Sequence, residues 1–357
     1  METRSNGDPV RAGRGRTLAI LGGATLLFTA LAIGAVWQRS PGSADTGAKL
    51  LFPGLAAQLS ALGEIAIQTK DSQFHIREVE GKGWVVTERN DFPADHNAVH
   101  ALVVGISSLE TVEAKTARPE LHAALGLVAP DKGGEAVRVS LADTAKKPLA
   151  DVLVSQTREA PDAEGRNRLY VRKTGEDQSW LARGSLNLQP DIAAWLSKSI
   201  FTLTRERIQS ASITPLTAPA FSVSRVNAEQ AGFQLAAIPA GRQLGFPAAA
   251  TNLATTITEF RFEDIRPVPQ VDFTKASTLT LKTFDGLTLK LQIATADGAQ
   301  WATIHADGAG DAAAKEAAAI NAKADGWAFK LPEYLATALI PARDTLLKPP
   351  AHAAPAR

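Results

Sequence analysis

Residues 83–110 read GWVVTERNDFPADHNAVHALVVGISSLE and change from a strand pattern to a helix pattern within a few residues. Residues 83–87 are rich in β-branched side chains, which is typical of a short strand, and residues 91–95 (DFPAD) supply a turn and an acidic helix cap. The apolar side chains that follow recur every three or four positions, at Val99, Leu102, Val103, Ile106 and Leu109. This periodicity predicts an amphipathic helix that packs one face against a sheet.

Further strand patterns flank this stretch on both sides. Residues 65–68 and 74–79 precede it, and residues 137–141, 149–155 and 169–173 follow it. Each run is rich in β-branched or alternating apolar residues, and turn-forming Gly, Asp or Pro residues separate the runs. The chain is therefore predicted to have an α+β fold.

The same landmarks recur in the same order further along the chain. Phe-Pro-Ala occurs at residues 92–94 and again at 246–248, 154 positions later, and Arg-Pro occurs at 118–119 and again at 266–267, 148 positions later. Such a near-constant spacing is typical of two tandem, duplicated sheet-plus-helix units. The alternative is that two unrelated α+β segments of similar length share these landmarks.

Residues 17–37 form a run of 21 residues without a charged side chain. As a helix, with a rise of about 1.5 Å per residue, this run spans about 30 Å, the thickness of the bilayer's hydrocarbon core. Four arginines precede it, so the positive-inside rule places the N-terminus in the cytoplasm and the rest of the chain in the periplasm. The alternatives are a cleaved secretory signal, which usually has a shorter apolar run, and a buried soluble helix.

These patterns predict a single-pass protein of the cytoplasmic (inner) membrane. Its parts are a cytoplasmic basic tip (1–16), a transmembrane anchor (17–37), a stalk (38–50), a first α+β unit (51–208), a second α+β unit (209–342) and a disordered tail (343–357). The Ala-rich residues 311–323 predict an exposed helix, which we align with the loop 159–168 of the first unit. Ile192, Trp195, Leu196 and Ile200 predict another helix.

Composition and motifs exclude several function classes. The 357 residues carry a net charge of +1, so the chain lacks the strong positive field of nucleic-acid-binding proteins. The absence of cysteine excludes disulfides, thiolate nucleophiles and cysteine-based zinc sites. No phosphate-binding loop, dinucleotide fingerprint, nucleophile elbow or HExxH motif occurs. The sequence therefore indicates no cofactor and no enzyme of these classes.

Two histidines are candidate metal ligands. His96 and His100 lie four residues apart on the predicted helix, a spacing that directs two imidazoles toward one ion, and Asp91 or Asp95 could add an oxygen ligand. In the alternative interpretation, Asp95 is the helix cap and both histidines lie on a solvated flank.

Three acidic pairs could supply the two carboxylates of an acid–base hydrolase: Asp91 with Asp95, Glu110 with Glu113, and Glu263 with Asp264. Asp91 and Asp95 bracket a proline at a strand-to-helix junction, which equally indicates capping. The hydroxyls of Ser107 and Ser108 have no nearby base in the sequence.

Four tryptophans lie on predicted strands or at their edges, at Trp84, Trp180, Trp301 and Trp327. They could line a groove between the two units, or they could be core anchors that bury large apolar areas.

Six short motifs follow the predicted membrane helix in a fixed order: GWVV at 83–86, FPAD at 92–95, RPEL at 118–121, LGL at 125–127, DGL at 285–287 and GWAF at 326–329. Taken as an ordered set with that helix, they resemble the bacterial family known as domain of unknown function 4340 (DUF4340). The resemblance covers residues 17–342 and implies a bacterial envelope protein. Members are often encoded beside subunits of gliding-motility-type ABC transporters, which implies an accessory role in a membrane complex. The family supplies no catalytic residues.

Three functions follow from these observations as hypotheses. The first is a non-enzymatic, membrane-anchored accessory component that binds an integral membrane or envelope protein. The second is a ligand-binding module with a cleft between the two units. The third is an envelope hydrolase that uses one of the acidic pairs.

Overall fold

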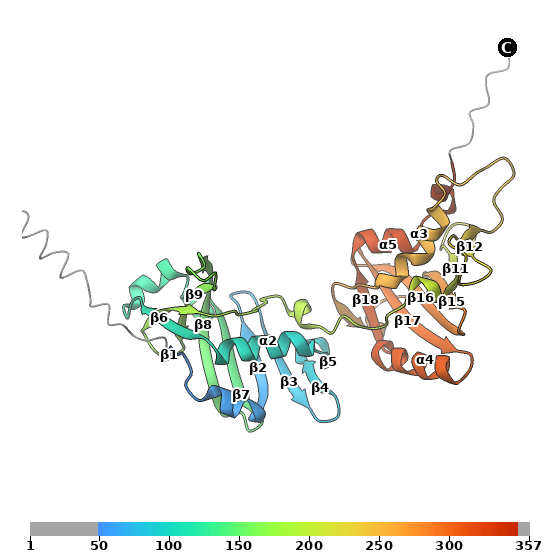
Figure 1. Cartoon of the computed structure of the whole chain (residues 1–357). Coiled ribbons are helices and arrows are strands. Elements are labelled where there is room, and N and C mark those ends of the chain that lie inside the picture. The colour runs from blue at the N-terminus through green and yellow to red at the C-terminus, as the bar shows by residue number, and fades with distance from the viewer. Residues whose placement is uncertain (1–48, 349–357) are drawn as a thin grey trace, which may run out of the picture.

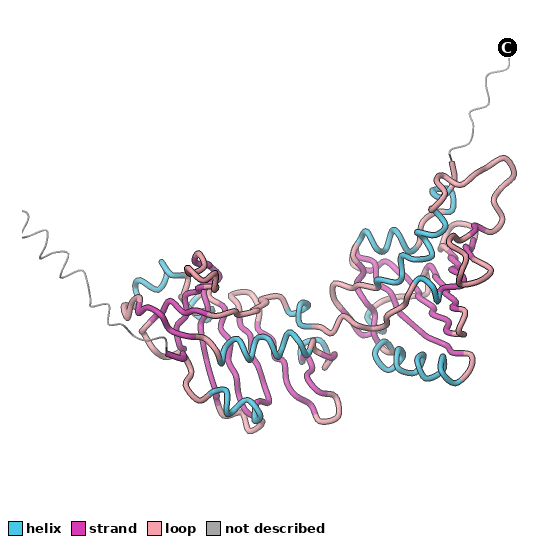
Figure 2. Tube along the Cα trace, viewed as in Figure 1, coloured by secondary structure: helices cyan, strands magenta, loops and turns pink. Residues whose placement is uncertain are grey.

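The computed structural model describes residues 49–348, which form two units that lie side by side (Figures 1 and 2). Each unit is built around one antiparallel β-sheet, and few helices accompany the sheets. The predicted α+β fold is therefore confirmed.

The predicted tip (1–16), the predicted anchor (17–37) and the stalk up to residue 48 lie outside the described residues. Within residues 49–348, no helix has both the length and the apolar character needed to cross a bilayer. Lys49 and Leu50, at the end of the predicted stalk, form a short strand that pairs with Thr111 and Glu110.

The first unit contains the larger sheet. Its strands are β1 (Lys49–Leu50), β2 (Leu62–Gln68), β3 (Gln73–Val79), β4 (Gly83–Val86), β5 (Phe92–Pro93), β6 (Glu110–Ala114), β7 (Val137–Asp143), β8 (Pro148–Glu159), β9 (Arg168–Lys173) and β10 (Ser179–Arg183). They lie in the order β1-β6-β10-β9-β8-β7-β2-β3-β4-β5.

Helix α2 (His96–Ser107) covers one face of this sheet (Figure 1). The carboxylate of Asp95 begins the helix by accepting hydrogen bonds from the backbone N–H groups of Asn97 (2.9 Å) and Ala98 (3.2 Å). The predicted apolar stripe, which includes Leu102 and Ile106, is fully buried in the main core. The segment that follows β6 contains η3 (Pro119–Leu125) and η4 (Pro130–Lys132) and forms a smaller core on the opposite face.

The second unit has eight strands: β11 (Ile208–Thr214), β12 (Phe221–Ser224), β13 (Gln234–Leu235), β14 (Ile265–Pro267), β15 (Ser277–Thr283), β16 (Leu287–Ala296), β17 (Ala299–Gly308) and β18 (Trp327–Leu331). Their order is β13-β12-β11-β15-β16-β17-β18-β14. Its helices are α3 (Ala249–Thr255), which continues into η7 (Thr256–Glu259), α4 (Asp311–Ala324) and α5 (Glu333–Leu339).

The two sheets share one strand order. The series β4-β3-β2-β7-β8-β9-β10-β6 of the first unit corresponds strand for strand to β13-β12-β11-β15-β16-β17-β18-β14 of the second, and β1 and β5 are additional edge strands. The ladders are also interrupted at equivalent points. The register of β2 on β7 shifts between Leu62 and Glu64, and the register of β11 on β15 shifts between Ile208 and Ser210. The repeated sequence landmarks therefore correspond to a repeated topology.

The β7–β8 hairpin of the first unit and the β15–β16 hairpin of the second are each closed by a side-chain hydrogen bond at the equivalent position. Asp143 ends β7, and its carboxylate accepts a hydrogen bond from the backbone N–H of Lys147 at 2.8 Å. Thr283 ends β15, and its hydroxyl oxygen accepts one from the backbone N–H of Leu287 at 2.9 Å. Both side chains bond to the residue four positions ahead, so the two turns are held in the same way despite their different sequences.

The Ala-rich segment forms a helix, α4, but our alignment of it with loop 159–168 is wrong. The helix lies between β17 and β18, which correspond to β9 and β10, so its counterpart is the short turn at 174–178. It is also not exposed all round, because Ala313, Ala317, Ile320 and Ala324 are buried. The side-chain amide of Asn321 donates to the carbonyl of Ala306 and accepts from its N–H, both at 2.8 Å. These two bonds take the place of those that a neighbouring strand would make to Ala306.

Two further predictions are corrected. The helix predicted over 192–200 ends early, as η5 (Ile192–Trp195), because Leu196 is extended and pairs with Ala94 of the first unit. Residues 343–347, which we placed in a disordered tail, include η9 (Arg343–Leu346) and pack on the second unit. Leu346 and Leu347 are buried there, and the carbonyl of Leu346 accepts a hydrogen bond from the N–H of Gly245.

The segment between β10 and η5, residues 184–191, crosses helix α2 at Gly105, and we call this segment the strap. A Cβ atom on Gly105 would lie 2.6 Å from the carbonyl oxygen of Ser185 and 3.2 Å from the side chain of Leu186. Glycine is therefore required here by the close approach of the strap to the helix.

Gly105→Ala is expected to lower the free energy of unfolding by about 1–2 kcal/mol. Alanine in a helix normally gains about 1 kcal/mol over glycine, but overpacking against a backbone carbonyl costs more, about 1–3 kcal/mol. Urea unfolding measures the change. Val104→Ala, on the exposed side of the same helix, is the control and should leave stability nearly unchanged. A stabilised Gly105→Ala variant would show that the strap is not held against the helix.

Candidate functional site

The two units meet through the ring of Phe92, which lies in β5 of the first unit and is only 1% exposed. It makes edge-on contacts with three aromatic rings of the second unit, with centroid distances of 5.2 Å to Trp327, 6.2 Å to Phe262 and 6.4 Å to Phe329. The first Phe-Pro-Ala motif therefore ends a strand and also supplies the apolar contact of this junction.

An ion pair crosses the junction beside this ring. The guanidinium of Arg89 binds both carboxylate oxygens of Asp264, with distances of 2.7 Å from Nε and 3.0 Å from Nη2. Both side chains are about one quarter to one third exposed, so the pair is partly shielded from water. Its two-point geometry fixes the orientation of one unit against the other more strongly than a single contact would.

Lys198, on the segment that links the units, is held at the same place. Its Nζ donates to the carbonyls of Phe262 (3.2 Å) and Glu263 (3.3 Å) and lies 4.3 Å from the centre of the Phe262 ring. Burial lowers the pKa of Lys198, and the nearby carboxylates of Asp264, Asp191 and Glu263 only partly offset this effect.

The junction also accounts for the acidic pair Glu263 and Asp264. Asp264 binds Arg89, as described above, and Glu263 forms an ion pair of 2.8 Å with Lys330 of β18. The two carboxylates thus have separate cationic partners on different elements. This arrangement serves the packing of strands and units.

Asp91 and Asp95 have separate structural roles as well. Both carboxylate oxygens of Asp91 accept hydrogen bonds from Nη2 of Arg77 at 2.8 Å, and the backbone of Asp91 is left-handed, with φ of 59°. Asp95 caps α2. These two residues therefore hold the strand-to-helix turn, as the capping interpretation predicts.

The third acidic pair lies on β6. Glu110 binds the guanidinium of Arg183 on the neighbouring strand β10, and Glu113 forms an ion pair with Lys115 at 2.8 Å. Opposite charges on adjacent strands are a common stabilising arrangement of an antiparallel sheet.

The candidate metal ligands and nucleophiles lie on α2. His96 and His100 are exposed, and their ring centres are 6.5 Å apart. Among residues 49–348, no group of three or more His, Asp or Glu side chains is arranged to hold a metal ion. The hydroxyls of Ser107 and Ser108 both donate to the carbonyl of Val104, at 2.9 Å and 2.8 Å. Both hydroxyls therefore bond to the backbone in the last turn of α2.

The four predicted tryptophans do not meet in one groove. Trp84 lies on β4 and Trp180 on β10, and five strands of the first sheet separate them. Trp301 is 2% exposed in the smaller core of the second unit, where the guanidinium of Arg266 lies 4.3 Å from its ring centre. Trp327 alone among the four contacts the other unit through Phe92.

Two depressions flank the junction. One, of about 280 Å³, lies between the units and is lined in part by Arg89, Asn90, Gln270 and Trp327. The other, of about 450 Å³, is lined in part by Lys198 and by residues of the Glu263 and Asp264 pair.

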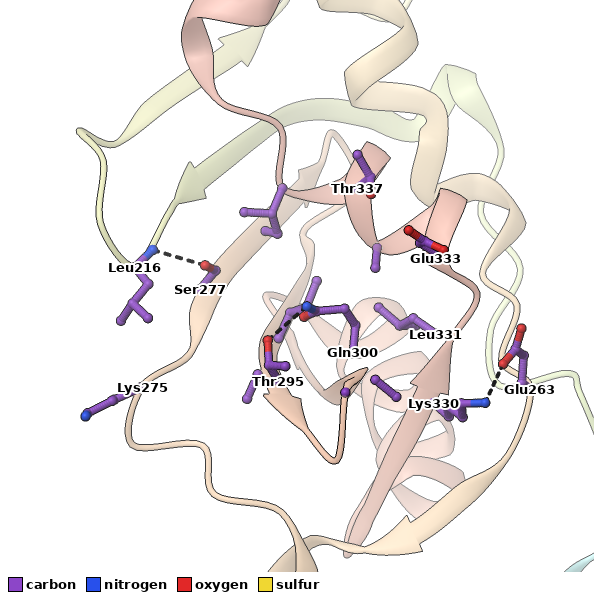
Figure 3. A pocket seen from close by; sticks show the side chains of 16 residues that line it. Leu216, Glu263, Lys275, Ser277, Thr295, Gln300, Lys330, Leu331, Glu333 and Thr337 are labelled. Carbon is purple, nitrogen blue, oxygen red and sulfur yellow. Dashed lines mark hydrogen bonds and ion pairs between the residues drawn. The ribbon is translucent and has the colours of Figure 1, made fainter.

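A larger pocket, of about 770 Å³, lies entirely in the second unit (Figure 3). Its wall is formed by α5, including Thr337, and by the ends of β15, β16 and β18. Gln300 and Thr295 bond to each other at 2.9 Å on its floor, and the ion pair of Glu263 and Lys330 closes one side.

A family model described as "Domain of unknown function (DUF4340)" matches residues 84–323, about two thirds of the chain. The chain belongs to the DUF4340 family. The match begins at β4 of the first unit and ends within α4 of the second, so it includes part of each unit of this DUF4340 protein. Searches of curated proteins and of solved structures return no match. The DUF4340 description assigns no activity, so the site residues rest on geometry.

Sequence reasoning named Asp264, Phe92 and Trp327, but it did not pair Phe92 with Trp327, and it missed Arg89 and Lys198. Arg89 lies 175 positions from Asp264 in the chain, and no local pattern marks the two as a pair. Lys198 lies in the segment that we predicted as a helix.

Proposed function

We propose that this protein is a non-enzymatic accessory component of a cell-envelope complex, held in the cytoplasmic membrane by residues 17–37. The uncharged run of 21 residues and the arginines that precede it support this orientation, with both units in the periplasm. The partner is an integral membrane or envelope protein, and the family resemblance favours an ABC transporter of gliding-motility type.

The observation that carries the non-enzymatic role is the use of the six candidate carboxylates. Each has a structural partner: Asp91 with Arg77, Asp95 with the end of α2, Glu110 with Arg183, Glu113 with Lys115, Glu263 with Lys330 and Asp264 with Arg89. A general acid or base needs a carboxyl that can reach a substrate proton, and each of these six groups is instead engaged in an ion pair or a helix cap within the protein.

We also infer that the two units arose by duplication. The shared strand order supports this origin, and so do the register shifts and turn caps, which lie at equivalent positions of the two sheets.

Affinity purification of the full chain from gently solubilised membranes tests the partner-binding role. We expect a membrane protein to be recovered in a stoichiometric amount. The matched control is the same chain with residues 17–37 replaced by an unrelated membrane-spanning helix, which separates partners of the units from partners of the anchor. Recovery of the chain alone in both cases would contradict the proposal.

The absence of cysteine makes the orientation directly testable. Ala163→Cys, in an exposed loop of the first unit, should react with a membrane-impermeant maleimide in intact spheroplasts. Ser5→Cys, in the basic tip, should react only after the cells are lysed. The unsubstituted chain is the control because it has no thiol. Equal labelling of both variants in intact cells would show that the assigned orientation is wrong.

The depression between the units favours ligand binding as a second candidate function. It combines an aromatic face from Trp327 with the amides of Asn90 and Gln270, a set that suits a small polar ligand such as a glycan. Thermal-shift screening of the full chain against glycans should reveal a stabilising ligand, and Gln270→Ala should weaken that shift. No stabilisation by any glycan would remove this candidate.

A further inference from the structure

Among residues 49–348, His96 and His100 are the two histidines whose ring nitrogens have no bonding partner. The other three have ring nitrogens at 2.7–3.8 Å from an oxygen atom: His75 near Glu88, His122 near the carbonyl of Asp177, and His305 near Asp307 and Asp325. Hydrogen bonds and ion pairs thus occupy the other rings, while the nitrogens of His96 and His100 are available to bind an ion.

The two rings project from the same side of α2. Side chains four positions apart lie one above the other on a helix, with Cβ atoms about 5–6 Å apart. The rings are stacked, with centroids 6.5 Å apart and an angle of 27° between their planes. A metal ion that binds one nitrogen of each ring needs those nitrogens within about 4.2 Å of each other, because a metal–imidazole bond is about 2.0–2.1 Å long. Both side chains are exposed, so they can turn toward a common ion without a movement of the helix.

The helix that carries the pair is a rigid support. The carboxylate of Asp95 caps its first turn, and Leu102 and Ile106 fix its inner face in the main core. The strap lies against it at Gly105. Because the backbone of both histidines is already ordered, binding an ion requires only that their side chains be oriented. No Lys, Arg, Asp or Glu occurs between residues 96 and 107, so the helix itself carries no fixed charge that repels a cation.

The sequence also suggested Asp91 or Asp95 as an oxygen ligand, and the structure assigns both to other roles. Asp91 binds Arg77, and Oδ1 of Asp95 accepts the hydrogen bonds that begin α2. The protein therefore supplies two nitrogen ligands at this place, and the exposed side of the helix leaves the other coordination positions to water.

We propose that His96 and His100 form a two-histidine site for a divalent transition-metal ion such as Ni²⁺, Cu²⁺ or Zn²⁺. Imidazole nitrogen suits these ions, whereas Mg²⁺ and Ca²⁺ prefer oxygen ligands. One nitrogen of each ring binds the ion, and water fills the remaining positions. The site differs from a structural zinc site, which has four protein ligands, so the fold does not depend on it. The inference goes beyond the partner-binding role and does not depend on it.

Isothermal titration of the full chain with Ni²⁺ tests the site, on protein purified without a polyhistidine tag. We expect one ion to bind per chain. His96→Gln and His100→Gln should each weaken binding at least about tenfold, because each leaves a single imidazole in place of a chelating pair. Both side chains are exposed and unbonded within residues 49–348, so neither substitution should change the urea unfolding curve.

Two control variants separate this site from binding to histidines in general. His305→Gln removes an exposed histidine of the second unit and should leave the affinity unchanged. Adding Ala101→His to His100→Gln keeps the number of histidines, but it places the second imidazole five positions from His96 and turns it away on the helix, so binding should not recover. Equal affinity of the unsubstituted chain and His100→Gln, loss of binding in His305→Gln, or full recovery with Ala101→His would each overturn the inference.

Discussion

Replacing Arg225 with methionine is expected to lower the free energy of unfolding of the second unit by about 3–5 kcal/mol. Arg225 is 6% exposed, and all five of its N–H groups donate to backbone carbonyls. The acceptors lie at 2.7–3.0 Å and belong to Arg205, Glu206, Ile208, Ala228 and Gln230. Removing the donor leaves these carbonyls without their bonds in a site with little access to water, and losses of this kind are among the largest that single substitutions cause.

The charge of Arg225 makes the site unusual. No carboxylate bonds to the guanidinium directly, and the rings of Phe233 and Phe284 lie 4.9 Å and 5.4 Å from it. Burial lowers the pKa of Arg225, and the positive charge of Arg205 adds to this effect. The side chain nevertheless stays protonated, because an arginine is not deprotonated in proteins. Carbonyl dipoles and ring faces therefore hold the charge in place of an acid.

Equilibrium urea unfolding of the full chain measures this effect. Arg225→Lys should recover only part of the loss, because an ammonium offers three donors where the guanidinium offers five. Arg118→Met, at an exposed position of the first unit, is the matched control and should change stability by about 0.5 kcal/mol or less. A loss below about 1 kcal/mol for Arg225→Met would show that water satisfies the five carbonyls as well as the guanidinium does.

Arg225 also shows where sequence reasoning reaches its limit. The alternation of apolar and polar side chains in β7, β8, β15 and β16 could be read directly from the sequence, because a strand in a sheet with one buried face places alternate side chains in the core. The role of Arg225 could not, because its partners are backbone carbonyls that any residue supplies. The same holds for Arg89, whose partner Asp264 is distant in the chain. Periodicity predicts which face is buried, but it does not predict which polar groups meet.

The place of α4 was open to prediction, although our alignment missed it. We aligned the Ala-rich segment 311–323 with loop 159–168, one hairpin too early, whereas the helix lies between β17 and β18. Such differences in length between duplicated units locate the places where the two units have diverged.

Phe92→Ala is expected to lower the free energy of unfolding by about 3–5 kcal/mol, the usual cost of removing a large aromatic side chain from a core. The cavity would open between the units, so the loss should also weaken their coupling. We expect one cooperative transition of the full chain to separate into two in calorimetry. A double-mutant cycle with Trp327→Ala should give a coupling of about 0.5–1.5 kcal/mol, the range found for edge-on aromatic pairs.

Phe246→Ala is the matched control, because Phe246 holds the same place in the second Phe-Pro-Ala motif and is 50% exposed. Its loss should cost less than about 1 kcal/mol, since little buried area is removed. Equal effects of the two substitutions would mean that the motif stabilises its own turn in each unit and that the ring of Phe92 does not join the units. Unequal effects would show that duplicated motifs have diverged, with Phe92 recruited to the junction between the units and Phe246 left at the surface.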